Sequence, residues 1–270
     1  MTVTAMLTSL ALLLLSRCAG IEAIEIGAAQ TPRAALVEAR ELAYNANARN
    51  DAAGLKRALA AFERLSADDP SSPLAAYYAT WTAWSLAGSH FQATDMDAAK
   101  EAVAIAVRYA RRGLSLQPGD VEFQTMAANA MIGQAVIDRD KFNALVPEIA
   151  AARKKALELG PRNPRAVMMD AGMIFNIPPD RGGSQEKGIA RFVEAVSLFD
   201  EEAAAATSSS DDLQPRWGRD LAHGWLAGMY LRLTPPAVDK ARAEIDKALF
   251  LRPDFWFVKE VLVPKLKHEH

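Results

Sequence analysis

The chain has 270 residues, of which 50% are hydrophobic and 24% are charged, and its formal net charge is −2 with a pI near 6.1. This profile is typical of a globular protein with a sizeable core and excludes a largely disordered chain. A slightly acidic chain offers no phosphate-neutralising surface, so we expect no nucleic-acid partner.

The N-terminal residues are typical of an export signal. An apolar run lies at 5–15, and small residues follow it up to Ala23. The run is shorter than the roughly 20 residues that a helix needs to span a bilayer. We therefore predict that residues 1–23 are a signal peptide and that the protein is periplasmic, in the bacterial envelope. The alternative is a first buried helix of the fold.

Cys18 is the single cysteine, so the residues after it can form neither a disulfide nor a cysteine-based metal site. The stretch "LSRC" at 15–18 is similar to a lipobox, the sequence at which bacterial lipoproteins are cleaved and acylated. Arg17 departs from that pattern, in which a small residue precedes the cysteine. The resemblance implies that Cys18 is lipidated and that lipid alone anchors the protein to the outer membrane.

A proline-centred cassette recurs along the rest of the chain. In "KKALELGPRNPRAV" at 154–167, an Ala- and Leu-rich run stops at a proline and a new apolar run begins after a polar turn. Similar cassettes surround Pro70, Pro118 and Pro253. The prolines recur roughly every 45 residues, with one double interval before Pro253. The polar insertion "ATSSSDDLQP" at 206–215 stands in that interval.

Each cassette predicts the turn of a helical hairpin. Proline ends the incoming helix because it lacks an N–H and clashes with the preceding turn, and it is harmless in the first turn of the next helix. Hairpins of this kind bury their apolar faces by stacking side by side. We expect no strands, and helices at about 33–49, 52–67, 73–88, 96–117, 120–138, 141–159, 164–175, 184–203, 215–232, 236–251 and 254–266.

The junction Ala-Leu-x-Leu-x-Pro-x-Asn/Asp resembles the junction between tetratricopeptide (TPR) repeats over most of residues 50–260. The spacing is longer than the roughly 34 residues of that family. The resemblance implies an all-α, right-handed superhelix of antiparallel helical hairpins, a TPR-like α-solenoid, over residues 30–268. The segment 176–195 also resembles a turn of TRAP-transporter T-components, which are envelope lipoproteins with similar repeats.

The same segment, "NIPPDRGGSQEKGIARFVEA", combines two prolines with two glycines. Ser184 is placed to cap the helix that comes after it. The pair Gly182–Gly183 leaves two interpretations open: a tight turn between repeats, or backbone N–H groups presented to an anion.

Aromatic and methionine side chains supply the candidate binding residues. Tyr77, Trp81 and Trp84 are spaced to share one helix face. Such residues either fill the holes between repeats or line a groove or cavity. The candidates for binding a ligand or partner are Tyr78, Trp81, Met126, Asn129, Met173, Asn176 and Trp225.

The histidines show no metal-ligand spacing, and no nucleophile–base arrangement can be assembled, so we expect neither an enzyme nor a cofactor or metal site. The leading hypothesis is a non-catalytic scaffold of the bacterial envelope that binds another envelope protein or a transporter subunit. The alternative is a transporter-accessory protein that holds a small organic solute or lipid in an apolar cavity. An open groove favours the first, a closed cavity the second.

Overall fold

The computed structural model describes residues 31–206 and 213–267. The chain divides into a unit of residues 1–32 and a unit of residues 33–270, and the helical fold belongs to the second unit. The predicted signal peptide and the lipidation of Cys18 lie outside the described residues. They stay predictions.

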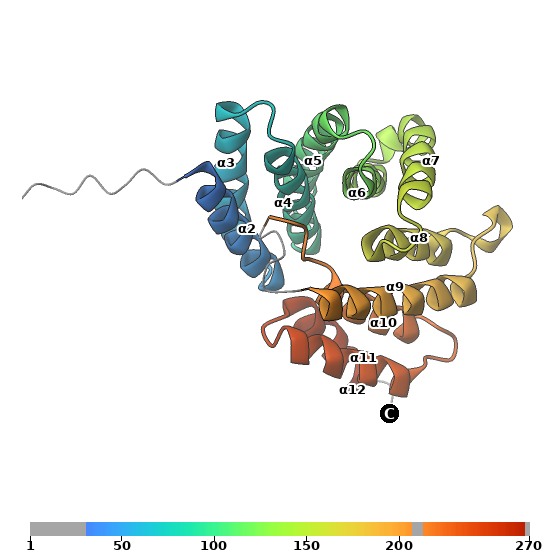
Figure 1. The fold of residues 1–270 in the computed structure, drawn as a ribbon. Helices are drawn as coiled ribbons and strands as arrows, with labels where there is room; N and C mark the ends of the chain where they lie inside the picture. The colour runs from blue at the N-terminus through green and yellow to red at the C-terminus, as the bar shows by residue number, and fades with distance from the viewer. Residues whose placement is uncertain (1–30, 207–212, 268–270) are drawn as a thin grey trace, which may run out of the picture. The chain divides into compact units, whose positions relative to one another are not determined.

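The described part of the second unit is helical, with no strand (Figure 1). Short helical turns follow α6 at Arg139–Lys141 and α8 at Pro179–Arg181, and a π-helical stretch at Phe257–Leu262 precedes the last helix. The α-helices are α2 (Pro32–Ala48), α3 (Ala52–Asp68), α4 (Pro73–Gln92), α5 (Met96–Leu116), α6 (Val121–Ile137), α7 (Phe142–Leu159), α8 (Pro164–Asn176), α9 (Gln185–Ala205), α10 (Arg219–Leu231), α11 (Val238–Leu251) and α12 (Val263–Lys267).

The observed helix starts confirm the predicted role of proline in the first turn. Pro73 and Pro164 stand in the first turns of α4 and α8, where their missing N–H groups leave no bond unmade. Polar side chains cap the N-termini. Ser184, predicted as a cap, accepts a hydrogen bond from the Lys187 N–H at 3.2 Å. The capping residues of α3, α4, α5, α6 and α8 are Asp51, Ser72, Asp95, Asp120 and Asn163.

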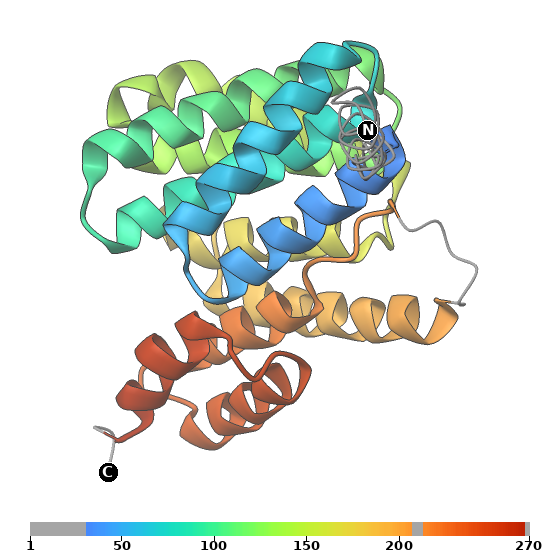
Figure 2. The same ribbon diagram turned by 90° about the vertical axis from the view of Figure 1, so that its left-hand side faces the viewer.

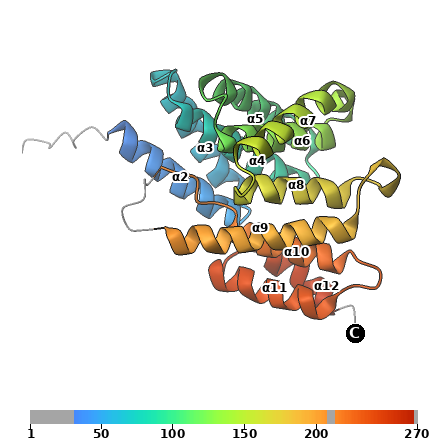
Figure 3. The same cartoon turned by 45° about the vertical axis from the view of Figure 1, so that its right-hand side comes forward.

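The helices pack as consecutive pairs: α4 with α5, α6 with α7, α8 with α9, and α10 with α11. The first helices of the first three pairs also contact each other, since α4 packs on α6 and α6 on α8, whereas α10 packs on α9. Figure 3 shows α9, α10 and α11 stacked below α8. The all-α solenoid of helical hairpins expected from the sequence is therefore present.

The inner helices α4, α6 and α8 are buried on most sides, whereas the outer helix α5 buries a single face. A helix that is apolar all round is normally covered on all sides. On α8, both Met168 and Met169 are buried, although adjacent residues of a helix point in different directions. Burial of both methionines therefore shows that α8 is packed on more than one side.

One helix boundary differs in an instructive way. The sequence predicts a helix from residue 215, but α10 begins at Arg219. Residues 215–218 are not helical, and Gly218 has a φ of 118°, a left-handed conformation that side chains disfavour. The residues before α10 are therefore an extended connection, and they reach the inner helices.

Candidate functional site

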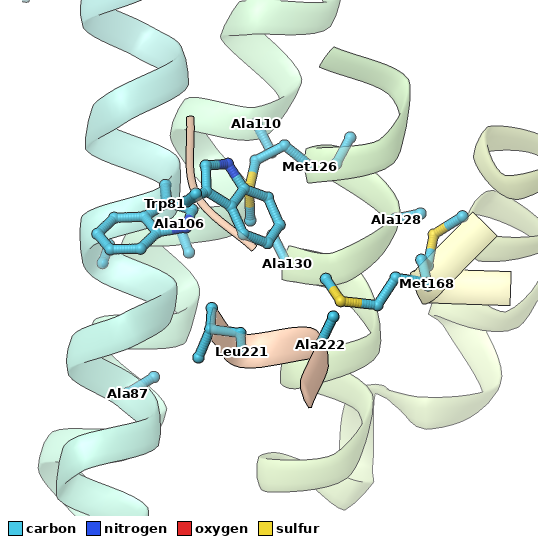
Figure 4. Close-up of a cluster of buried hydrophobic side chains, with 14 of the residues drawn as sticks. Trp81, Ala87, Ala106, Ala110, Met126, Ala128, Ala130, Met168, Leu221 and Ala222 are labelled. Atoms are coloured by element: carbon cyan, nitrogen blue, oxygen red, sulfur yellow. The ribbon is translucent and has the colours of Figure 1, made fainter. Parts of the chain in front are cut away.

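The predicted aromatic residues meet on the inner side of the solenoid. Trp81 of α4 lies edge-on to Tyr44 of α2, with ring centroids 4.8 Å apart. Trp84 lies 6.1 Å from Trp225 of α10, again edge-on. These are the separations at which aromatic pairs attract. Figure 4 shows that Met126 of α6, Met168 of α8 and Leu221 of α10 join Trp81 in one interior cluster.

The residues Leu213–Gly218, here called the strap, run along the inner helices as an extended peptide would. Leu213 and Trp217 are buried, whereas Gln214 and Arg216 are exposed. The Tyr78 hydroxyl donates to the Leu213 carbonyl at 2.7 Å. The Trp217 indole N–H donates to the Tyr77 hydroxyl at 2.8 Å.

Two further side chains hold the strap's main chain. Arg165 of α8 donates to the Pro215 carbonyl at 2.5 Å. The backbone N–H of Arg216 donates to the Tyr44 hydroxyl at 3.4 Å. Side chains of α2, α4 and α8 therefore supply the hydrogen bonds that the main chain of this non-helical segment needs. The strap, a segment of the same chain, therefore occupies this inner face.

Arg165 is the centre of a buried polar network. Its side chain is 0% exposed, and it pairs with Glu122 at 3.3 Å and with Glu202 at 2.8 Å. Tyr77 and Asn163 also donate to Glu122, at 3.1 and 2.7 Å. Burial raises the pKa of Glu122, and Arg165 and the two hydrogen bonds oppose that shift. Burial also acts against the charge of Arg165, but Glu122 and Glu202 outweigh it and raise the pKa of the guanidinium, which stays cationic.

An open cleft lies beside the strap, between the first helix of the unit and the last ones. Its volume is about 190 Å³. Tyr44, Trp81, Trp217 and Phe255 give it aromatic walls. The remaining lining residues are Asn47, Ala48, Arg216, Arg219, Asp220, Leu221, Leu251 and Arg252. We call this site the cleft.

The polar rim of the cleft is mostly cationic. Arg252 donates to the side-chain carbonyl of Asn45 at 3.1 Å and lies 3.5 Å from the Asp220 carboxylate. Arg219 pairs with Asp200, outside the cleft, at 2.8 Å. The lining thus holds three arginines and one aspartate. Asp220 also accepts a hydrogen bond from the backbone N–H of Leu221 at 2.9 Å, so its carboxylate occupies the N-terminus of α10.

The candidate residues predicted from the sequence fall into different environments. Tyr78, Trp81 and Met126 are buried in the core, while Asn129, Met173 and Trp225 are partly buried. Asn176 is exposed and accepts a hydrogen bond from Arg232 at 2.9 Å. Of these candidates, only Trp81 lines the cleft. The binding roles of all seven stay predictions.

A second, larger hollow of about 470 Å³ lies on another face, among α5, α6 and α7. Alanines and two larger apolar residues form much of it, and Arg111 pairs with Glu148 across it at 2.9 Å. Within residues 31–206 and 213–267, no group of three or more acidic, histidine or cysteine side chains is arranged to hold a metal ion. The helices in those ranges are all too short or too polar to span a membrane.

Comparison with known proteins gives structural neighbours only. The sequence matches no family model and no curated protein. A thermophilic TPR protein from Thermus thermophilus is similar in structure, with a TM-score of 0.54 and 18% identity over 85% of this chain and 98% of that one. The fold is TPR-like. The HusA haemophore from Porphyromonas gingivalis has a TM-score of 0.55 and 22% identity, over 72% of this chain and 92% of that one.

The TPR-like fold explains a pairing that sequence reasoning missed. Glu122 and Arg165 are each the second residue of an inner helix, four residues after the proline of their cassette, Pro118 or Pro161. Equivalent positions of adjacent repeats lie side by side in a solenoid. Aligning the cassettes at their prolines would therefore have placed the two opposite charges together. No comparable signal marks Arg216 or Arg252, because the strap breaks the repeat.

Proposed function

We propose that this protein is a non-catalytic, helical-repeat scaffold of the bacterial envelope that binds another envelope protein or a transporter subunit. The TPR-like fold supports the scaffold role, since stacked hairpins are typical protein-binding platforms. The export-like pattern of residues 1–23 supports the location. The strap and α10 fill the inner face, so the partner needs a different surface.

One end of the α4–α7 layer offers that surface. Five large apolar side chains are exposed there, between 38% and 50% of their maximum. They sit at the end of α4, the start of α5, the end of α6 and the start of α7. Because successive helices of stacked hairpins run antiparallel, these four termini share one end, and the α4–α5 turn of this end is visible in Figure 2. We call this set the apolar end: Phe91, Met96, Val136, Phe142 and Val146.

The apolar end is the observation that carries the proposal. Exposed apolar side chains are normal when scattered, but a group of them bordered by polar residues marks an interaction site. Asp97, Arg139 and Lys141 are exposed or partly exposed beside the group and supply such a border. Apolar side chains within a polar rim are the arrangement found in protein–protein interfaces.

Site-specific photocrosslinking in the source cells tests this. A benzoylphenylalanine in place of Phe142 is expected to form a covalent adduct with one defined polypeptide, identified by mass spectrometry. The same group in place of Phe250, which is 86% exposed on α11, is the matched control and should give none. Equal adducts at both positions, or none at 142, would contradict the proposal.

A second candidate is a transporter-accessory protein that binds a small organic solute. The cleft favours it, and one structural neighbour is described as a haemophore, a small-molecule carrier by name. Native mass spectrometry of protein from the cell envelope separates the two candidates. A small mass retained under mild activation and lost under harsh activation supports a solute, whereas a co-purified polypeptide supports the scaffold.

A further inference from the structure

The hollow of about 470 Å³ lies between the outer helices of two adjacent hairpins. Helices α5 and α7 both pack on α6, and Figure 1 shows α6 between them. The hollow therefore has α5 and α7 as its walls and α6 as its floor. We call it the outer hollow. It is separate from the cleft, because no residue lines both.

Short side chains leave this space open. Four of the ten lining residues are alanines: Ala110 of α5, Ala127 of α6, and Ala151 and Ala152 of α7. Packed helices normally fill the space between them at the density of an organic crystal, but methyl groups are too short to fill the gap between α5 and α7. A leucine of α5 and a methionine of α6 add to the apolar lining. A ligand that covers this surface would gain the hydrophobic effect.

The polar side chains of the outer hollow leave one cation for a ligand. Arg111 donates to both carboxylate oxygens of Glu148, at 2.9 and 3.1 Å. The Gln124 side-chain amide donates to a backbone carbonyl at 2.8 Å. Lys155 is exposed, and within residues 31–206 and 213–267 no carboxylate lies at ion-pair distance from it. The lining therefore carries one excess positive charge, at Lys155.

The size and polarity of the outer hollow define a single chain with one anionic end. Glu148 and Lys155 both line it and are seven residues apart on α7, which separates them by about 10 Å along the helix. A methylene group is similar in size to a water molecule, which takes up about 30 Å³, so the volume holds roughly 15 such groups. An acyl chain of about ten carbons meets both limits. A sugar or an extended peptide would need a row of hydrogen-bonding groups, and the lining is mostly apolar.

We infer that the outer hollow binds a medium-chain fatty acid as its carboxylate. The chain lies over the alanines between α5 and α7, and the carboxylate faces the Lys155 ammonium group. The methylene stem of Lys155 can lie along the apolar lining while its charge stays in solvent. The inference goes beyond the scaffold role and does not depend on it, because the outer hollow and the apolar end share no residue.

Calorimetric titration of the full chain with hexanoate, octanoate and decanoate, below the concentrations at which they form micelles, is the test. Each buried methylene is worth about fourfold in affinity, so each step of two carbons should tighten binding about 15-fold. Decyltrimethylammonium keeps the chain of decanoate but reverses the charge, and it should bind more weakly.

A second assay asks whether the chain can still be part of a membrane lipid. The outer hollow has room for one acyl chain of this length, whereas a phospholipid carries two longer ones. We therefore expect the protein not to float with phosphatidylglycerol vesicles in a density gradient.

Charge variants place the carboxylate. Lys155→Gln should weaken decanoate about two- to fivefold, the range expected for an exposed ion pair. Lys154→Gln is the matched control and should leave the affinity unchanged, because Lys154 pairs with Glu158 and does not line the hollow. Glu148→Gln should tighten decanoate, since it removes a negative charge from the lining and frees Arg111.

Size variants place the chain. Ala151→Leu puts a larger side chain into the outer hollow at an exposed position, and it should weaken decanoate by about tenfold or more, which corresponds to the loss of two or more buried methylenes. Ala150→Leu is the matched control, because Ala150 is exposed on the same helix but does not line the hollow.

Several results would overturn the proposal. They are absence of decanoate binding to the wild-type chain, equal affinity for hexanoate and decanoate, and equal loss in the Ala151 and Ala150 variants. Flotation with vesicles in the absence of decanoate binding would instead assign the outer hollow to a membrane surface. The chain-length series uses the wild-type chain alone, so it stands even if a variant does not fold. Crosslinking at Phe142 tests the apolar end separately, so failure of one proposal is distinguishable from failure of the other.

Discussion

At the scale of single residues, the most informative side chain is Arg165. It is buried, it joins α6, α8 and α9 through Glu122 and Glu202, and it holds the strap at the Pro215 carbonyl. Its guanidinium also lies 5.8 Å from the centre of the Trp217 ring, within the range of a cation–π contact. A buried ion pair gives little net stability, but removing one partner leaves an uncompensated charge.

We predict that Arg165→Met lowers the free energy of unfolding by about 3–5 kcal/mol, because Glu122 is left buried without its cation. The double variant Arg165→Met with Glu122→Gln should regain part of that loss, since the buried carboxylate is then gone as well. Urea denaturation followed by circular dichroism measures both. Two additive losses would show that the residues are not coupled.

Glu244 provides a prediction about pH. Burial acts against its ionisation, but hydrogen bonds with His223, at 2.6 Å, and Lys247, at 2.9 Å, outweigh it and lower the pKa of Glu244 below the ordinary 4.5. The folded state therefore binds fewer protons than the unfolded state. The resulting stability is complete above pH 4.5 and is lost as pH falls through the lowered pKa.

Glu244→Gln should accordingly destabilise the protein by about 1–2 kcal/mol at neutral pH. The difference between the variant and the wild type should shrink as the pH falls below 4.5. Melting temperatures recorded across an acid series measure it. Glu158→Gln, at an exposed pair with Lys154, is the control and should show little effect at any pH. A constant difference for Glu244→Gln would mean that the ionised carboxylate is not the stabilising form.

At the scale of elements, sequence patterns predicted the helices well because local chemistry decides their ends. Proline and capping side chains act within one turn, so the roles of Pro73 and Ser184 could be predicted directly. The strap could not be predicted in this way. Its "LQPRWG" resembles a helix start, and contacts with residues 50 to 172 positions away hold it extended. The cleft was missed for the same reason.

The packing of α8 on α9 depends on glycine at one position. A Cβ added at Gly188 would lie 2.7 Å from the backbone of Phe175, and backbone cannot easily move aside. Gly172, also within a helix of this pair, has open space around its Cβ position. The two glycines therefore form a matched pair in which only one is required for close approach.

Gly188→Ala should destabilise the protein by about 1–3 kcal/mol through overpacking. Gly172→Ala should stabilise it by up to about 1 kcal/mol, because alanine favours the helix more than glycine does. Thermal unfolding of the two variants measures the contrast. Stabilisation by both would show that α8 and α9 can separate without cost.

At the scale of the whole described unit, this solenoid departs from a simple row of repeats. Repeats in a row contact only their neighbours. Here the first helix of the unit meets the last ones, since Arg49 pairs with Asp254 at 2.7 Å and Arg252 donates to Asn45. The strap links α10 to the helices α2, α4 and α8 by hydrogen bonds, and its side chains Leu213 and Trp217 are buried. Exposed ion pairs contribute little to stability. The buried side chains of the strap must therefore supply most of the free energy that holds the first and last helices together.

We therefore expect Trp217→Ala to separate the unfolding of the C-terminal helices from that of the rest. Trp217 packs against Trp81 and Trp84, with centroids 6.2 and 6.4 Å away, and truncating a buried tryptophan costs about 3–5 kcal/mol. The wild type should unfold in one urea transition. In the variant, hydrogen exchange should show α10 and α11 opening before α4 and α6. Gln214→Ala, at an exposed position of the same strap, should keep the single transition. If Trp217→Ala also keeps it, with a loss below about 1 kcal/mol, the strap does not couple the two ends, because removing a tryptophan that is truly packed in the core has a larger effect.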